Sequence, residues 1–547
     1  MKPISVAKIV NNTNHGLEKD NLILMGNFNL LFSIALKNII VFHLQTYKKK
    51  WYLYIFKNYS SSKNMSQTIK DLQPQLLWKH FSNLCAIPRP SKNEGKAAEF
   101  VKEFAIEQQL DYTVDATGNV IIRKPATPGM EGRAGVILQA HLDMVPQKNS
   151  DVQHDFAKDP IAAYIDGDWV KAKGTTLGAD NGIGVAAALA ALESEDLVHG
   201  PLEALFTIDE ETGMTGANGL VAGLLKGSVF INLDSEAEGE LYIGCAGGLD
   251  AVSRFPYTSE PAGSDITAFE LRLTGLKGGH SGLDIHLGRG NANKLINRFL
   301  WKATRNCGLR LSSINGGNMR NAIPREAFAL VVIPSDKADE FQKDVALFST
   351  TISAELSGVE TDVSFTALPV ECPSTVLTLE SQNKLLNLIY AIPNGAKRMI
   401  SDMPEVVETS TNLSIVRSDG QHVEIACLLR SSVDSAKEGL GNAIAATCEL
   451  AGVTTKLSGS YPGWKPNFDS PILKTMKEVY LRLYGKPAAV KVIHAGLECG
   501  IFGKNYPDMD YISFGPTIEN PHSPGEKVNI PSVAKFWEYL VETLKTV

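Results

Sequence analysis

Strand-like apolar runs in this chain end repeatedly in histidine or acidic residues. The groups that follow such runs, or that stand just before an apolar helical pattern, are His141-Leu142-Asp143, Asp180, Asp209-Glu210-Glu211, Asp234 and, near the C-terminus, His522. In an open α/β sheet, ligands bind beyond the carboxyl ends of the strands. The pattern therefore predicts that imidazole and carboxylate groups gather at one edge of a sheet.

Two histidines and at least three carboxylates are a suitable donor set for two divalent cations. Zinc accepts imidazole and carboxylate, and manganese or cobalt can use the same ligands. Two such cations, about 3.5–4 Å apart, need one shared carboxylate and private ligands for each. A single Asp at a strand end usually caps a turn. Five such sites on successive strand ends are poorly explained by caps, so the sequence favours a two-metal site.

The spacing within two of these groups suggests a division of labour. His141 and Asp143 lie two positions apart at a strand end, so one can bind a metal while the other holds the ring nitrogen that faces away from it. Glu210 and Glu211 are adjacent, so their side chains diverge. One of them can bind metal while its neighbour faces the water to be activated.

Other catalytic motifs fit the chain poorly. It contains neither HExxH nor GxxxxGK[ST]. The segment 279–283 resembles a serine-hydrolase elbow but ends in Leu283 where that motif requires glycine. The segment 182–187 matches G-x-G-x-x-A, a weak nucleotide-binding pattern, and Asp180 just before it is better used as a metal ligand.

The elements that must position these residues alternate between strands and helices. The predicted helices lie within 71–90 and over 93–110, 185–192, 291–303, 435–450 and 471–483, and the predicted strands cover 120–122, 136–138, 204–208, 229–233, 269–273, 328–332, 423–429 and 511–514. Such alternation is typical of an α/β sheet that is covered on both faces. The pattern restarts over 251–458, which we interpret as a smaller α/β unit.

Length and composition set the general class. The chain has 547 residues, of which 44% are hydrophobic and 21% charged, so a globular protein of two to four domains is expected. The net charge of −7 argues against a nucleic-acid binder. Seven scattered cysteines without a CxxC pair argue against a zinc knuckle or a disulfide framework. They favour a reducing compartment, so we expect a cytoplasmic protein.

Residues 1–64 differ from the rest of the chain. Nine Lys, no Arg and two acidic residues give this segment a charge of +7, which leaves −14 for the remaining 483 residues. Its apolar run over 22–44 is interrupted by polar residues, so it fits neither a membrane span nor a signal peptide. We interpret 1–64 as an extension outside the domains, with a weak membrane anchor as the alternative.

Several longer segments are typical of one enzyme family. They are QAHLDMVP at 139–146, GADNG at 178–182, TIDEETG at 207–213, NLDSE at 232–236, GGHSG at 278–282, NAIPRE at 321–326 and HAGLECG at 494–500. From about residue 65 to residue 547 the chain resembles the aminoacyl-histidine dipeptidases, also called Xaa-His or cytosol non-specific dipeptidases. These belong to a clan of di-metal aminopeptidases, carboxypeptidases and deacylases.

The resemblance implies an α/β fold in which a lid domain interrupts a di-metal catalytic domain with a central mixed sheet. The implied catalytic segments are 65–250 and 459–547, and the lid is 251–458. The resemblance also implies a homodimer formed through the lid. No nucleic-acid partner is expected, and a membrane partner is disfavoured.

The resemblance also implies individual roles. Asp180 would bridge two divalent cations, most naturally Zn²⁺ with Co²⁺ or Mn²⁺ as alternatives, and a cis peptide bond would join Asp180 to Asn181. The private ligands would be His141 and Asp234 for one cation, and Glu211 and His522 for the other. Asp143 would orient His141, and Glu210 would be the general base.

The implied reaction is hydrolysis of dipeptides, including Xaa-His substrates such as carnosine. Glu210 would take a proton from a water between the cations and later give it to the leaving amine. In the lid, His280 would contact the oxyanion or the substrate carboxylate, either within its own chain or across the dimer. Asn321 and Arg430 would bind the substrate's C-terminal carboxylate. The alternatives are a tripeptidase, an N-acyl amino acid deacylase, or an inactive relative that only binds.

Overall fold

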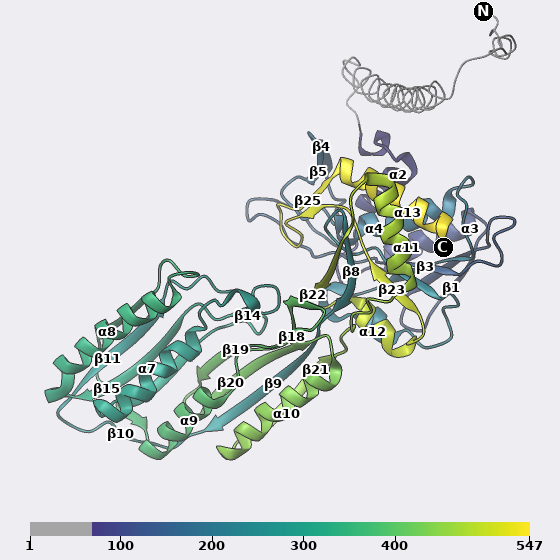
Figure 1. The fold of residues 1–547 in the computed structure, drawn as a ribbon. Helices are drawn as coiled ribbons and strands as arrows, with labels where there is room; N and C mark the ends of the chain where they lie inside the picture. Colours follow the sequence, from purple (N-terminus) through teal and green to yellow (C-terminus); the bar gives the residue numbers. More distant parts are fainter. Residues whose placement is uncertain (1–67) are drawn as a thin grey trace, which may run out of the picture. The chain divides into compact units, whose positions relative to one another are not determined.

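The computed structural model describes residues 68–547, so the extension predicted over 1–64 lies outside the described residues. The first large sheet has eight strands in the order β1-β2-β6-β3-β7-β23-β8-β22 (Figure 1). Their bounds are β1 Asp111–Val114, β2 Val120–Lys124, β6 Leu202–Thr207, β3 Val136–His141, β7 Val229–Asn232, β23 Asp510–Ser513, β8 Glu240–Cys245 and β22 Ala489–Ile493. Strands β6, β3, β7 and β23 are parallel, whereas β1, β2 and β6 pair antiparallel. The sheet is therefore mixed.

Helices cover both faces of this sheet because successive residues of its strands point to opposite sides. Leu138 of β3 packs into one core with α2, α4, α11 and α13. Ile137, the preceding residue, packs into a second core with α6 and α12. The helices of this part are α2 Gln75–Cys85, α3 Gly95–Glu107, α4 Ala179–Glu193, α5 Glu210–Gly213, α6 Thr215–Gly219, α11 Pro471–Tyr484, α12 Glu498–Asn505 and α13 Ile530–Thr546.

In sequence, the strands of the second large sheet lie between β8 and β22 of the first sheet. It runs β16-β11-β15-β13-β19-β20-β9-β21, and β18 pairs with β19. The bounds are β16 Ser364–Pro369, β11 Ile266–Thr274, β15 Ala327–Pro334, β13 Arg310–Gly316, β19 Met403–Ser418, β20 His422–Ser431, β9 Gly247–Pro256, β21 Thr455–Tyr461 and β18 Gly395–Ile400. We call this sheet and its helices the lid.

Helices cover one face of the lid sheet (Figure 1). They are α7 Ala292–Asn306, α8 Ala338–Leu356, α9 Leu379–Ala391 and α10 Asp434–Leu450. Along β11, Phe269 and Leu271 are buried in the core beneath these helices, whereas Arg272 on the other face is exposed. The lid therefore has its own hydrophobic core.

Three small sheets complete the fold. One joins β24 Ile518–Glu519, β25 Lys527–Asn529, β5 Trp169–Ala172 and β4 Ala163–Asp166, and the others pair β10 Ser259–Pro261 with β17 Thr375–Leu377 and β12 Gly279–His280 with β14 Ala322–Ile323. Within residues 68–547, no helix combines the length and apolar character that crossing a membrane requires. The predicted fold class, an α/β protein with a central mixed sheet, is confirmed.

Candidate metal centre and active site

Five side chains from separate elements meet at one edge of the central sheet. His141 Nε2 lies 3.1 Å from Asp180 Oδ1 and 3.3 Å from Asp234 Oδ1. His522 Nε2 lies 3.0 Å from Asp180 Oδ2 and 3.0 Å from Glu211 Oε2. Asp180 therefore belongs to two three-residue groups, one with His141 and Asp234 and the other with Glu211 and His522. The structure thus gathers all five residues that the sequence analysis named as metal ligands.

The geometry of this cluster fits two divalent cations. Ligand bonds of about 2.0–2.2 Å in a tetrahedral site place neighbouring donor atoms about 3.3–3.6 Å apart, close to the separations in both groups. Glu211 Oε1 is buried and has no hydrogen-bond partner within residues 68–547, as expected of an oxygen that binds a cation. The donor set of two imidazoles and three carboxylates suits zinc, manganese or cobalt.

Asp143 connects His141 to the segment that carries both glutamates. Its carboxylate is fully buried and lies 3.3 Å from His141 Nδ1, which leaves Nε2 to face the cluster. The same carboxylate accepts hydrogen bonds from the amides of Glu210 (3.0 Å) and Glu211 (3.2 Å) and from the Ser91 hydroxyl (2.8 Å). Asp143 therefore sets the relative position of one imidazole and of two carboxylates.

The loop before Asp180 is held by two buried charged side chains. The carboxylate of Glu526 accepts hydrogen bonds from four consecutive amides, those of residues 177–180, at 2.7–3.2 Å. Arg89 donates to the carbonyls of Leu142, Asp143 and Gly178, so it joins this loop to the loop after β3. The peptide bond between Asp180 and Asn181 is cis, as the resemblance implied.

The helix that follows Asp180 does not serve as a phosphate-binding turn. Gly182 and Gly184 of the G-x-G-x-x-A pattern are both buried in α4. A Cβ atom at Gly182 would lie 2.7 Å from the Arg89 guanidinium and 3.1 Å from the Phe81 ring. Close packing therefore accounts for this glycine.

Crowded charges shift the titration of the cluster. Burial disfavours a charged imidazole at His141, but the carboxylates of Asp234, Asp143 and Asp180 outweigh this and hold its pKa well above the usual range. Burial and the nearby carboxylates of Asp180 and Glu211 raise the pKa of Asp234 to about 7, although His141 opposes the shift. Such mutual repulsion among carboxylates is what bound cations relieve.

The pKa of Glu210 is raised, like that of Asp234. Burial is the largest cause, and the carboxylates of Asp234, Glu498 and Glu211 add to it, so the pKa of Glu210 lies well above the usual range although His141 opposes the rise. Asp143 shows the opposite behaviour. Burial alone would raise its pKa, but His141, the Glu210 amide and the Ser91 hydroxyl lower it to about 2. Asp143 is thus a fixed negative charge, whereas Glu210 is poised to hold a proton.

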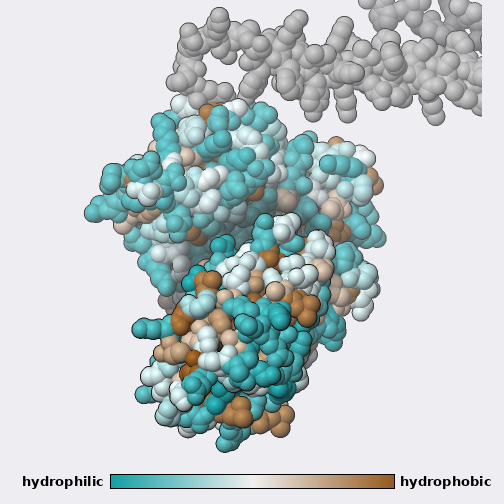
Figure 2. Space-filling view, turned by 90° about the vertical axis from the view of Figure 1, so that its left-hand side faces the viewer, coloured by the Kyte–Doolittle hydropathy of each residue, from teal (hydrophilic) through white to brown (hydrophobic). Residues whose placement is uncertain are grey.

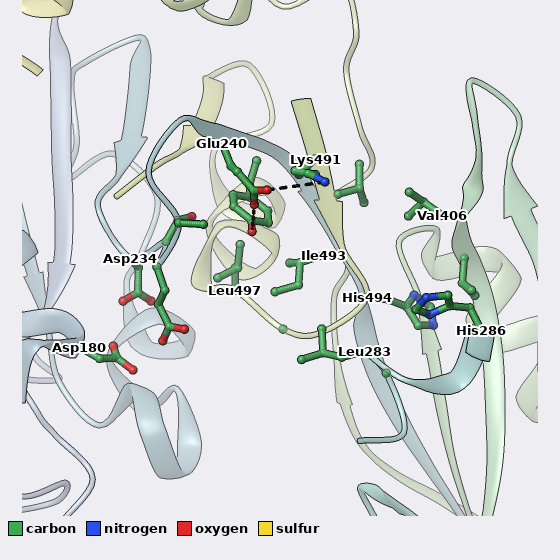
Figure 3. A pocket seen from close by; sticks show the side chains of 18 of the residues that line it. Asp180, Asp234, Glu240, Leu283, His286, Val406, Lys491, Ile493, His494 and Leu497 are labelled. Atoms are coloured by element: carbon green, nitrogen blue, oxygen red, sulfur yellow. Dashed lines mark hydrogen bonds and ion pairs between the residues drawn. The ribbon is translucent and has the colours of Figure 1, made fainter. Parts of the chain in front are cut away.

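A cleft of about 650 Å³ opens beside the cluster. Figure 3 shows Asp180 and Asp234 on one side of it and Leu283, His286 and His494 on the opposite side. The end wall carries Glu240, which lies 3.6 Å from Lys491 Nζ. On the face drawn in Figure 2, the surface is largely hydrophilic and is hollowed between its upper and lower parts.

The predicted lid residues form a separate group. Arg430 is buried, and its Nη2 lies 3.3 Å from His280 Nε2 while its Nη1 donates to Tyr461 Oη at 3.3 Å. Asn321 is exposed, and its carbonyl accepts a hydrogen bond from the Ser281 amide. Within residues 68–547, the lining of the cleft includes none of His280, Asn321 and Arg430.

Sequence reasoning did not identify Ser91, Arg89, Glu498 or Glu526. Each contacts residues far away in the chain, and Glu526, for example, binds amides about 350 positions earlier. Glu498 is fully buried and accepts hydrogen bonds from Gln139 of β3 and Thr207 of β6. These two strands lead to His141 and to Glu211. The only local signal was that Glu498 belongs to the HAGLECG segment. Spacing along the chain gave no indication of the partners.

The fold and the cluster together define a two-metal peptidase architecture, and comparison with known proteins agrees. The model of the family described as "Peptidase family M20/M25/M40" matches residues 137–546, which include the five clustered residues. The chain therefore belongs to this peptidase family, and the resemblance noted in the sequence is confirmed.

Individual relatives are similar over nearly their whole length. The chain is 48% identical over 479 residues to the cytosol non-specific dipeptidase of Escherichia coli (strain K12), which covers 88% of this chain and 99% of that protein. It is 49% identical to the crystal structure of aminoacylhistidine dipeptidase from Vibrio alginolyticus, with a TM-score of 0.84 over 88% of this chain and 98% of that one. The aminopeptidase PepT of Bacillus cereus, 15% identical with a TM-score of 0.51 over 87% of this chain and 98% of that one, shares the fold alone.

Proposed function

We propose that this protein is a metallodipeptidase that hydrolyses dipeptides, Xaa-His substrates such as carnosine among them. The single observation that carries the proposal is the pair of three-residue groups that share Asp180 and open into a cleft. The cleft is large enough for a small peptide and far too small for a folded protein. The relatives named as dipeptidases, which match almost the whole described chain, support the same substrate class.

Two divalent cations would be held by the clustered residues. His141 and Asp234 would hold one, Glu211 and His522 the other, and Asp180 would bridge them. When bound, such cations lower the pKa of a water molecule between them and polarise a carbonyl oxygen. Zinc is the first choice because imidazole and carboxylate are its common ligands, and cobalt or manganese remain alternatives.

Glu210 would act as the general base. Both Glu210 and its neighbour Glu211 line the cleft, but Glu211 pairs with His522 and Glu210 does not. A raised pKa suits a residue that takes a proton from water and then returns it to the leaving amine. Asp143 would hold His141 and the Glu210 amide in register throughout the reaction.

The lid group would bind the negatively charged parts of the substrate. His280 Nδ1 accepts the amides of Gly282 (3.3 Å) and Leu283 (3.0 Å), so a neutral ring carries its proton on Nε2. That Nε2 lies 3.3 Å from an Arg430 nitrogen, which is also a donor. Burial and the Arg430 charge lower the pKa of His280 to about 4, so the ring is neutral near pH 7. Two donors that face each other need an acceptor, such as a carboxylate or a developing oxyanion.

Asn321, the domain division and the cellular location complete the proposal. Asn321, which directly precedes β14, the partner of the His280 strand, would join Arg430 in binding the C-terminal carboxylate. Because the cleft lining includes none of these residues, they would reach the substrate by lid closure or from the partner of a homodimer. The proposed division is 65–250 and 459–547 for the catalytic domain and 251–458 for the lid. The E. coli relative is named a cytosol enzyme, which supports a cytoplasmic location.

The test combines metal analysis with a substrate panel. The purified protein should contain two equivalents of metal and should hydrolyse carnosine and several unrelated dipeptides, but not tripeptides or N-acyl amino acids. Glu210→Gln should keep both metals and lose about 10²–10⁴-fold in kcat, because it removes the general base only. Hydrolysis of tripeptides or N-acyl amino acids in preference to dipeptides would favour a sister enzyme. A protein that binds no metal would be an inactive relative.

A further inference from the structure

Glu236 occupies an unusual position beside the metal cluster. It follows Asp234 by two residues on the loop after β7, and its side chain lines the cleft together with Asp180 and His522. The intervening Ser235 faces the core, where its hydroxyl lies 2.7 Å from Ser513 Oγ. Glu236 is half-buried, and within residues 68–547 its carboxylate has neither a hydrogen-bond donor nor an ion-pair partner.

The next two glutamates along the chain, Glu238 on the same loop and Glu240 at the start of β8, are paired. Glu240 accepts a hydrogen bond from the Tyr242 hydroxyl at 2.6 Å and lies 3.6 Å from Lys491 Nζ. Glu238 lies outside the cleft lining and binds Lys535 Nζ at 2.6 Å. Glu236 therefore differs from its neighbours because it faces the cleft and has no cation of its own. A charged group in such a wall is costly unless a ligand brings the opposite charge.

We propose that Glu236 binds the free ammonium group of the substrate. This inference rests on the proposed dipeptidase function and adds a residue to it. In a dipeptide of α-amino acids the amine nitrogen is two bonds, or about 2.5 Å, from the carbonyl carbon that is attacked. The ammonium group must therefore lie next to the metal cluster when the carbonyl lies on it. Glu236, two residues beyond Asp234 in the same cleft wall, meets that requirement.

The same contact separates dipeptides from N-acyl amino acids. A dipeptide brings an ammonium group that pairs with Glu236, whereas an N-acyl amino acid brings an uncharged group and leaves the carboxylate unpaired. A site built to bind a polar group rejects an analogue that lacks it much more strongly than an apolar pocket rejects a missing methylene. Glu236 would thus make this cleft select substrates with a free amino terminus.

The experiment compares two substrates that differ only in the amine. Alanyl-histidine carries the ammonium group, and propionyl-histidine has a hydrogen in its place. Steady-state kinetics near pH 7 are measured for the metal-loaded wild type, Glu236→Gln, Glu236→Asp and the matched control Glu238→Gln. The control makes the same chemical change two residues away, at a side chain outside the cleft lining. Metal content is measured for every variant.

The wild type should prefer alanyl-histidine by at least about 10–100-fold in kcat/KM, which is the usual worth of a hydrogen bond to a charged group. Glu236→Gln should reduce this preference to a few-fold, chiefly through a higher KM for alanyl-histidine, with both metals retained. Glu236→Asp should restore part of the preference, and Glu238→Gln should leave it intact.

Three different results would overturn the inference. If the wild type hydrolyses dipeptides but Glu236→Gln slows both substrates by the same factor, Glu236 does not bind the ammonium group and the dipeptidase function still stands. If the metal-loaded wild type hydrolyses no dipeptide, the proposed function fails and the inference fails with it. A Glu236→Gln protein that does not fold leaves the decision to Glu236→Asp. An unchanged substrate ratio and unchanged KM in that variant would equally refute the role.

Discussion

Glu526 offers a direct test of how the fold positions the bridging carboxylate. In Glu526→Gln one carboxylate oxygen becomes an amide NH₂. Two of the four backbone amides of residues 177–180 therefore lose their acceptor. Each buried unsatisfied amide costs about 1–3 kcal/mol, so the substitution should destabilise the loop by about 2–6 kcal/mol. Part of this loss should be expressed in metal binding, because residues that orient metal ligands typically contribute about 10–100-fold to affinity.

The assay is a zinc titration of the metal-depleted protein against a chromophoric chelator, together with thermal unfolding. Glu526→Gln should bind zinc about 10–100-fold more weakly than the wild type. Glu519→Gln is the matched control, because Glu519 belongs to the same C-terminal region but is half exposed and pairs with Lys527 at 2.8 Å. A Glu526→Gln protein with wild-type zinc affinity and unchanged unfolding would show that the four hydrogen bonds do not position Asp180.

Three further predictions concern His280 in the lid and His494, which lies after β22 on the other side of the cleft lining. His280→Ala should keep its fold and metal content and lose about 10²–10³-fold in kcat with a smaller change in KM, because a donor to the oxyanion acts mainly in the transition state; an unchanged kcat would remove His280 from the mechanism. Mixing His280→Ala with Glu210→Ala subunits should restore activity if the histidine acts across a dimer, whereas proven exchange without recovery would place it within one chain. Burial and the Arg430 charge lower the pKa of His494 from 6.5 to about 3, so between these pH values the unfolded chain binds a proton that the folded chain does not. The free energy of unfolding should therefore fall as the pH decreases, by about 2 kcal/mol between pH 7 and pH 5 from this residue; urea unfolding of His494→Gln should show a smaller decrease, and an identical pH dependence would contradict the assignment.

The amino-acid sequence by itself was sufficient to locate the metal cluster. Strands such as β3 and β7 are buried on both faces, so they read as continuous apolar runs whose ends are easily recognised. Since neighbouring parallel strands end at the same edge, His141 and Asp234 had to approach each other. All of the predicted helices and strands are present for the same reason, since hydrophobic periodicity reports burial directly.

Where the hydrophobic pattern of the sequence is weak, only the tertiary structure shows which element forms. Strand β19 runs for 16 residues, but its buried stretch carries Ser410, Thr411 and Asn412, so no apolar pattern marks it. These side chains are buried because β18 and β20 pair with the strand on its two sides, and polar partners come from other segments such as β14. Asn412, for instance, donates to the Ala322 carbonyl. Burial of polar residues depends on such partners, which a local sequence window does not contain.

The residues that orient the cluster were likewise decided by the fold. Glu526 and Arg89 act on loops that are distant in sequence, and a lone Glu or Arg has no spacing pattern to mark it. The sequence determined the donor set, because ligand chemistry depends on residue type and strand ends on hydrophobicity. The three-dimensional structure determined which charges hold the ligands and which carboxylate of the cleft wall, Glu236, is left without a partner among residues 68–547, because both depend on which groups folding brings within hydrogen-bond distance.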